Sequence, residues 1–133
     1  MGARTKARKR ALDVLFASEM RGQSAVEQLE ADIAAGDGPT NPYTATLVRG
    51  VAEHRTEIDA LLTERADGWS LERMPAVDRN VLRIAVWEIL HADDVDAAVA
   101  VSEALVLVGD LSTDDSPGFV NGVLGAIVRA QRA

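Results

Sequence analysis

The chain has 133 residues, of which 47% are apolar, 26% are charged and none is cysteine. This length suits one small domain, and the composition excludes an intrinsically disordered chain. No apolar run approaches the roughly 20 residues of a membrane-spanning helix, and no apolar segment of a secretion signal follows the N-terminal MGARTKARKR. Without cysteine the chain forms no disulfide and no Cys-based zinc site, and we expect a cytoplasmic protein without membrane contact.

The net charge of −7 is distributed unevenly along the chain. The 123 residues that follow the first ten hold nine basic and 21 acidic groups, which gives them a net charge of −12. This asymmetry predicts a basic arm that meets a polyanion and an acidic body that repels it or faces a different partner. A merely solubilising terminus is the alternative interpretation of the arm. The arm carries a charge of +5 from Arg4, Lys6, Arg8, Lys9 and Arg10.

Apolar residues recur at helical spacing almost throughout, which predicts an all-α fold. A first helix is expected over residues 4–21 and ends at Gly22, and Ser24 caps a second helix. The Asn41-Pro42 pair is typical of a helix start, and the third helix is expected over residues 42–67 as the longest. The side chains expected in the core of the first two helices are Leu12, Leu15, Phe16, Met20, Val26, Leu29 and Ile33.

The C-terminal half predicts three more helices, which begin near Pro75, Asp96 and Ser116. Apolar residues cover most of the circumference of the first of these, over residues 77–90, as expected of a central helix. We therefore expect one domain built of two packed antiparallel three-helix bundles. Its parts are the basic arm of residues 1–10, an N-terminal bundle of residues 11–67 and a C-terminal bundle of residues 75–133.

Motifs for catalysis or metal binding are scarce in the sequence. His54 and His91 lie in no zinc-binding pattern, and no nucleophile stands on a sharp turn beside a base. We therefore expect no enzyme, no metal and no cofactor. The glycine-rich residues 118–125 lack the preceding strand and the Lys-Ser or Lys-Thr of a phosphate-binding loop. Three glycines share one helix face there and predict the close approach of a neighbouring helix: Gly118, Gly122 and Gly125.

Three segments together resemble the NusB family of bacterial transcription antitermination factors. They are ARKRALDVLF at residues 7–16, VDRNVLRIAVWE at residues 77–88 and DDSPGFVNGVL at residues 114–124. Their order and spacing make the resemblance specific, and it covers nearly the whole chain. The most distinctive element is FVNGVL after an acidic loop that contains serine. The resemblance implies the all-helical fold of two three-helix bundles that the apolar spacing also predicts.

The resemblance also implies a function. Such a protein binds boxA RNA together with NusE, a small-subunit ribosomal protein. The complex acts with other Nus factors on RNA polymerase to suppress premature termination, chiefly in ribosomal RNA operons, and no reaction is catalysed. The same fold occurs on some ribosomal RNA methyltransferases, so an RNA-binding or protein-interaction module of such a system is the alternative. A homodimer is also compatible with the family.

The resemblance places several residues at RNA-binding positions. The cations of the arm surround the helical axis, which favours a flexible arm that orders on phosphates over a rigid ridge on one face. Arg79 and Arg83 are expected to form one basic stripe on the central helix, with an intramolecular ion pair as the alternative for Arg79. The residues expected to contact RNA are Arg4, Lys6, Arg8, Arg83, Asp115 and Phe119.

Two of these residues have structural alternatives. Phe119, at the start of the last helix, is expected either to stack on an unpaired base or to pack in the core with Val123 and Ile127. Asp115 is expected either to accept a hydrogen bond from a base amino group or to cap that helix. A family match makes Asp78 the candidate contact for NusE. The aromatic residues expected in packing are Phe16, Trp69 and Trp87, with a partner surface as the alternative for Trp87.

Overall fold

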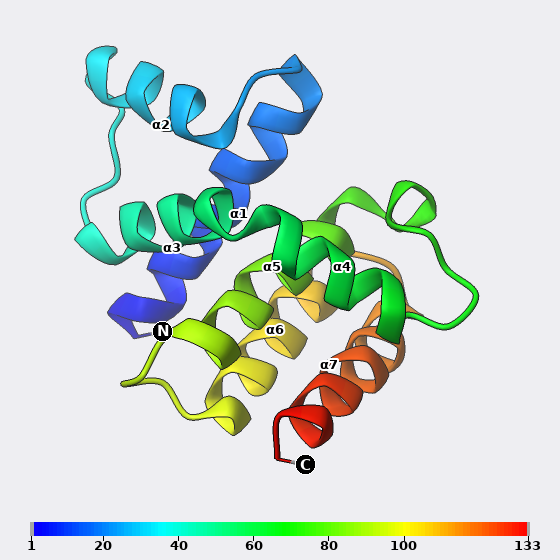
Figure 1. Ribbon diagram of the computed structural model, residues 1–133. Coiled ribbons are helices and arrows are strands. Elements are labelled where there is room, and N and C mark those ends of the chain that lie inside the picture. The colour runs from blue at the N-terminus through cyan, green and yellow to red at the C-terminus, as the bar shows by residue number, and fades with distance from the viewer. Residues whose placement is uncertain (1, 133) are drawn as a thin grey trace. The chain divides into compact units, whose positions relative to one another are not determined.

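The computed structural model describes residues 2–132, and these residues are all-α, as predicted (Figure 1). The chain divides into two units, of which the first ends at His54 and the second begins at Arg55. The first unit contains α1 (Ala3–Arg21), α2 (Ala25–Ala34) and α3 (Pro42–Glu53). The second unit contains α4 (Arg55–Arg65), the short 3-10 helix η1 (Leu71–Arg73), α5 (Ala76–His91), α6 (Ala97–Leu111) and α7 (Ser116–Arg132).

In the first unit each of the three helices packs against the other two. The ends of these helices follow from local sequence, as predicted. Ser24 Oγ accepts a hydrogen bond from the N–H of Glu27 at 3.1 Å, and Asn41 Oδ1 accepts one from the N–H of Tyr43 at 2.9 Å. Gly22 ends α1 with a φ of 66°, a left-handed conformation that favours glycine.

The core of the first unit is smaller than the apolar pattern predicts. Leu12 and Leu15 of α1 are buried, but Phe16, Met20 and Ile33 expose 37%, 59% and 52% of their surface. Helical spacing identifies an apolar face but not how much of that face a neighbouring helix covers. The expectation that these three side chains lie in the core is therefore wrong.

The long third helix predicted over residues 42–67 is divided in the structure. α3 ends at Glu53 and α4 begins at Arg55, while His54 leaves helical geometry with φ −105° and ψ 17°. The apolar spacing continues across this break, because Val51 is buried on one side of it and Ile58 on the other. The pattern therefore does not reveal the break. The division of the chain falls at this point, ahead of residues 67–75 where the sequence predicts it, and the second unit holds four α-helices.

α5 is the central helix of the second unit, as its apolar circumference predicts. It packs against α4, α6 and α7. Seven consecutive residues, 80–86, are buried on it, and they include the charged Arg83. A helix with neighbours on three sides leaves little surface to solvent, so even its polar side chains need partners inside the protein.

The glycine face of α7 does not serve the close helix packing that the sequence predicts. A Cβ atom added at Gly118 or Gly122 would meet nothing within 4 Å. At Gly125 the nearest atom that a Cβ would meet is Nη1 of Arg129, at 3.3 Å, within the same helix. These glycines thus occupy open helix surface and carry the conformational cost of glycine without a packing gain.

Gly122→Ala should stabilise the protein. Glycine is roughly 0.5–1 kcal/mol less favourable than alanine inside a helix, and the added methyl group has room. Urea unfolding should therefore show a free energy of unfolding that rises by this amount. The matched control is Gly22→Ala, which should lower it by about 1–2 kcal/mol because alanine is strained at a φ of 66°. Equal effects of the two substitutions would contradict the assignment.

Candidate nucleic-acid interface

The basic arm is the start of a helix in this structure. Residues 3–10 form the first turns of α1, so the prediction of a flexible arm is wrong for the residues that the structure describes. Met1 lies outside these residues. Along the first turns Arg4, Lys6 and Lys9 are exposed, whereas Ala7 and Arg8 are buried. The start of α1 therefore presents some of its cations to solvent and uses others in packing.

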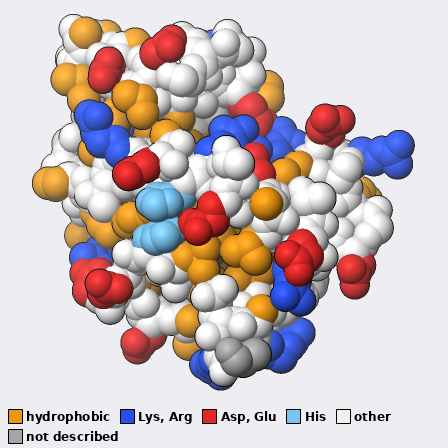
Figure 2. Space-filling view, in the orientation of Figure 1, with side chains coloured by type: hydrophobic (Ala, Val, Ile, Leu, Met, Phe, Trp, Pro, Cys, Tyr) orange, Lys and Arg blue, Asp and Glu red, His pale blue; other side chains and the backbone are white. Residues whose placement is uncertain are grey.

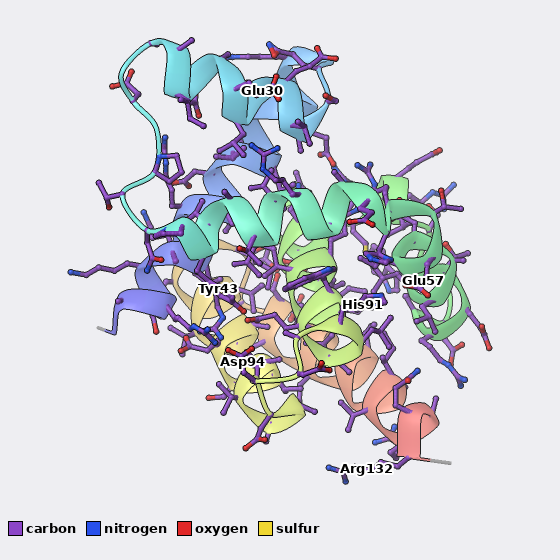
Figure 3. The ribbon with its side chains drawn as sticks, turned by 60° about the vertical axis from the view of Figure 1, so that its left-hand side comes forward. Glu30, Tyr43, Glu57, His91, Asp94 and Arg132 are labelled. Atoms are coloured by element: carbon purple, nitrogen blue, oxygen red, sulfur yellow. The ribbon has the colours of Figure 1, made fainter. Side chains whose placement is uncertain are left out.

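Tyr43 connects the start of α1 to the start of α3. The guanidinium carbon of Arg4 lies 4.2 Å from the centre of the Tyr43 ring, and that of Arg8 lies 5.7 Å from it. Both distances are typical of cation–π contacts. Figure 3 labels Tyr43 near the first turns of α3. Arg8 is only 3% exposed, so it supports this cluster rather than presenting its charge on the surface. Tyr43 is not among the residues that the sequence predicts for this site, although it directly follows the Asn41-Pro42 helix start.

A hollow of about 160 Å³ lies beside the exposed cations of α1. Polar side chains of α3 attach the two helices here: Asn41 Nδ2 donates to the carbonyl of Ala3 at 3.3 Å, and Thr44 Oγ1 to the carbonyl of Ala7 at 2.9 Å. Arg10 is held by Asp32 at 3.5 Å and by the carbonyl of Asp37. The hollow is lined by Ala3, Lys6, Ala7, Arg10, Thr40, Asn41 and Thr44.

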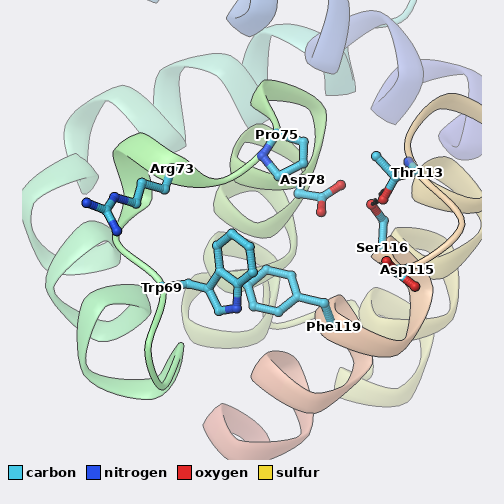
Figure 4. Close-up of a pocket in the computed structure, with 8 residues that line it drawn as sticks. All are labelled: Trp69, Arg73, Pro75, Asp78, Thr113, Asp115, Ser116 and Phe119. Atoms are coloured by element: carbon cyan, nitrogen blue, oxygen red, sulfur yellow. Dashed lines mark hydrogen bonds between the residues drawn. The ribbon is translucent and has the colours of Figure 1, made fainter.

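A second candidate region lies in the second unit, where the loop before α7 faces the connector before α5 (Figure 4). Here a pocket of about 490 Å³ contains both Asp115 and Phe119. The Phe119 ring packs against the Trp69 ring with 5.9 Å between centroids and 59° between planes. The pocket is lined by Trp69, Arg73, Pro75, Asp78, Thr113, Asp115, Ser116 and Phe119.

Phe119 lies between the two predicted environments. Val123 and Ile127, which share its helix face, are buried at 4% and 0% exposure, whereas Phe119 itself is only half-buried. Its ring therefore packs on Trp69 and keeps part of its surface at the pocket. Asp115 is exposed, and within the described residues its carboxylate has no hydrogen-bond partner. Its backbone carbonyl accepts the first helical hydrogen bond of α7 from the N–H of Phe119 at 3.2 Å, and its side chain does not cap the helix.

Asp78 is not a surface residue, so the structure does not offer it as a direct contact for NusE. Its side chain is 2% exposed, and it accepts a hydrogen bond from Ser112 Oγ at 2.6 Å. Ser116 Oγ donates to Ser112 Oγ at 3.0 Å, and Thr113 Oγ1 lies 2.8 Å from Ser116 Oγ. This chain of hydroxyl groups attaches the loop before α7 to the buried start of α5, and therefore positions Asp115 and Phe119.

Arg83 is also internal. It is 4% exposed, and its Nε and Nη2 atoms bind the two oxygens of Asp59 on α4 at 2.9 and 3.2 Å. Its Nη1 donates to Asn80 Oδ1 at 3.1 Å. Arg79 donates to the carbonyls of Leu71 and Met74. The expected basic stripe is therefore absent from α5 as the structure describes it, because both arginines bind partners within the second unit.

The two tryptophans are both partly exposed. Trp69 is 50% exposed, so the expectation that it is a packing anchor is only partly right, and Trp87 is half-buried.

Figure 3 shows His91 of α5 and Glu57 of α4 directed toward one another, and His91 Nε2 lies 2.7 Å from Glu57 Oε1. This pair links α4 to α5.

Acidic and basic side chains are interspersed on the face drawn in Figure 2, and the acidic ones occur at several separate places. Among the described residues, no helix is long and apolar enough to cross a membrane.

Asp78→Ala should lower the free energy of unfolding by about 1–3 kcal/mol, because it leaves the Ser112 hydroxyl without its acceptor. Asp114→Ala removes the same charge from an exposed position of the loop and should change stability by less than about 0.5 kcal/mol. Urea melts of both variants measure the difference. Similar stabilities would show that Asp78 does not anchor the loop.

Arg83→Ala should destabilise the protein by about 3 kcal/mol, because Asp59 and Asn80 lose their shared buried partner. Arg55 provides a matched control, since it binds the same Asp59 at 2.9 Å but is 47% exposed. Arg55→Ala should cost less than about 0.5 kcal/mol. Thermal or urea unfolding of the two variants tests whether α5 depends on the internal pair, and a small effect for Arg83→Ala would argue against it.

Comparison with known proteins agrees with this architecture. The model of the NusB family matches residues 5–129. The transcription antitermination protein NusB of Nocardioides sp. is 70% identical over 129 residues, which cover 97% of this chain and 96% of that protein. The structure of NusB from T. maritima is 31% identical, with a TM-score of 0.85 over 96% of this chain and 92% of that one. A structure of antitermination factors NusB and NusE in complex with double-stranded RNA is 28% identical, with a TM-score of 0.82 over 96% of both chains. This chain therefore belongs to the NusB family.

Proposed function

We propose that this chain is a transcription antitermination factor that binds boxA RNA together with NusE. In this role it acts in the cytoplasm with other Nus factors and RNA polymerase to support read-through of ribosomal RNA operons, and it catalyses no reaction. The observation that carries the proposal is the set of exposed cations on the first turns of α1, in a chain that belongs to the NusB family. A relative of this chain has been solved with NusE and RNA.

The exposed cations are suited to a phosphate backbone. Arg4 and Lys6 both lie in the first turn of α1, on different sides of the helix, and this turn contains no acidic residue. Cations that neutralise phosphates release counterions, which supplies sequence-independent affinity and makes binding depend on salt. Arg8 contributes by holding Tyr43, which in turn contacts Arg4. The arm thus has an exposed part that meets RNA and a buried part that orients it.

The acidic remainder of the chain suits a basic partner. The 123 residues after the arm carry a net charge of −12, which repels RNA but attracts a basic ribosomal protein. Because Asp78 is buried, we assign it to positioning the loop before α7 and not to direct contact with NusE. Attraction to NusE then depends on the exposed acidic side chains of the body.

Replacing Arg4 and Lys6 together by Gln should weaken boxA binding and flatten its salt dependence. Each lost contact with a single-stranded phosphate lowers the log–log salt slope by roughly 0.7, so the double variant should lose about 1.4. Filter binding with boxA RNA and NusE at several salt concentrations measures the slope. Substitution is preferable to deletion of residues 1–10, because Ala7 and Arg8 are buried and their removal would disturb the first unit.

The control for this experiment is Arg129→Gln combined with Arg132→Gln. These residues lie in the last turn of α7, so the double variant changes the net charge equally at a different place. We expect its salt slope to match that of the unmodified chain. Equal slopes for all three proteins would contradict an RNA contact at the start of α1.

A further inference from the structure

The pocket of the second unit has an aromatic wall that the proposed function leaves unexplained. Trp69 exposes 50% of its surface, although it packs on Phe119 and lies in a pocket of about 490 Å³. Pockets for small organic groups have volumes of roughly 300–1,000 Å³ and combine apolar walls with a few polar groups. In Figure 4 the two rings stand together on one side, and Asp115, Ser116 and Thr113 lie on the other.

We propose that Trp69 is a base-stacking residue, which together with Phe119 receives one unpaired nucleobase of the bound RNA, while Arg73 contacts a neighbouring phosphate. This inference rests on the proposed RNA-binding function and extends it to two residues of the connector between α4 and α5. Aromatic side chains stack on unpaired bases because every base has a π-face. The pocket brings such a surface together with a cation and a hydrogen-bond acceptor.

The ring geometry indicates which surface is used. The centroids of Trp69 and Phe119 are 5.9 Å apart, which is direct contact, and their planes are tilted by 59°. A flat base therefore does not fit between the two rings. The exposed part of Trp69 is the stacking surface, and Phe119 supports it from the side.

The connector that carries Trp69 is held in place before any RNA binds. Gly68 adopts a φ of 78°, which permits the turn, and the N–H of Trp69 donates to the carbonyl of Ala66 at 3.0 Å. Arg79 of α5 donates to the carbonyls of Leu71 and Met74 at 2.8 and 3.1 Å. A stacking surface that is already ordered loses less conformational entropy on binding.

The polar side of the pocket favours certain bases. A carboxylate such as that of Asp115 only accepts hydrogen bonds, so it matches a base with an exocyclic amino group. Adenine, guanine and cytosine have such a group, and uracil does not. Arg73 is exposed, and a guanidinium is well suited to bind phosphate.

The test is a titration of boxA RNA, in the presence of NusE, with Trp69→Ala, Trp69→Phe and Trp87→Phe. Trp69→Ala should weaken binding by about 5- to 150-fold, the range measured for loss of one stacked base. Trp69→Phe keeps a ring and should recover most of the affinity, whereas Trp87→Phe should bind as the unmodified chain does. In the Trp87→Phe protein, Trp69 is the one remaining tryptophan, and its fluorescence should be quenched on RNA binding.

RNAs with a single abasic position identify the base. For one position, removal of the base should weaken binding of the RNA to the unmodified chain. For the Trp69→Ala variant, RNA without this base should bind as well as intact RNA. At this position a base with an amino group should bind better than uracil, and Asp115→Ala should remove that preference. Arg73→Gln should lower the log–log salt slope by roughly 0.7.

The outcomes separate the two hypotheses. If the unmodified chain with NusE does not bind boxA RNA, the proposed function fails and this inference fails with it. If the unmodified chain binds RNA and folded Trp69→Ala binds equally well, only the inference is overturned. A third outcome is that Trp69→Ala lowers the affinity for NusE in the absence of RNA but leaves the effect of every abasic position unchanged. The pocket is then a protein-docking site, and the inference is likewise overturned.

Discussion

Burial of α5 on three sides is the constraint on which the second unit depends. Charged side chains on the buried faces of such a helix cannot reach water, so they must find partners within the protein. Arg83 finds Asp59 of α4, and Asp78 finds Ser112 at the end of α6. The central helix therefore connects α4 and the loop before α7 through polar contacts as well as through apolar packing, and this loop carries Asp115 and Phe119.

In the first unit, one helix combines core packing with a concentration of positive charge. α1 buries Leu12 and Leu15 for stability while its first turns carry a concentration of positive charge. Tyr43 supports both roles, because its ring attracts the guanidinium groups of Arg4 and Arg8. The same few turns of α1 thus contribute to both packing and surface charge, so a substitution that alters one of these properties also affects the other.

The sequence predicts the local features of this fold well, because their causes are local. The caps at Ser24 and Asn41 and the end of α1 at Gly22 depend on residues a few positions apart. The sequence does not predict the break at His54, because the apolar spacing continues through it. The sequence does not predict the burial of Asp78 and Arg83 for a related reason. Local sequence does not distinguish a charged residue that faces water from one that is paired inside the protein. Their partners, Ser112 and Asp59, lie 34 and 24 positions away in the chain.

The beginning of α1 has an electrostatic consequence of its own. Its first turn contains no acidic residue, and Gly2 provides no side-chain cap. The positive end of the helix dipole therefore faces Arg4 and Lys6, so that electrostatic repulsion opposes the folding of these turns. A polyanion bound there cancels the repulsion, and binding that favours the folded form stabilises it by mass action. Binding of such a ligand should therefore strengthen the first turns of α1, and slower hydrogen exchange at these amides should report occupancy.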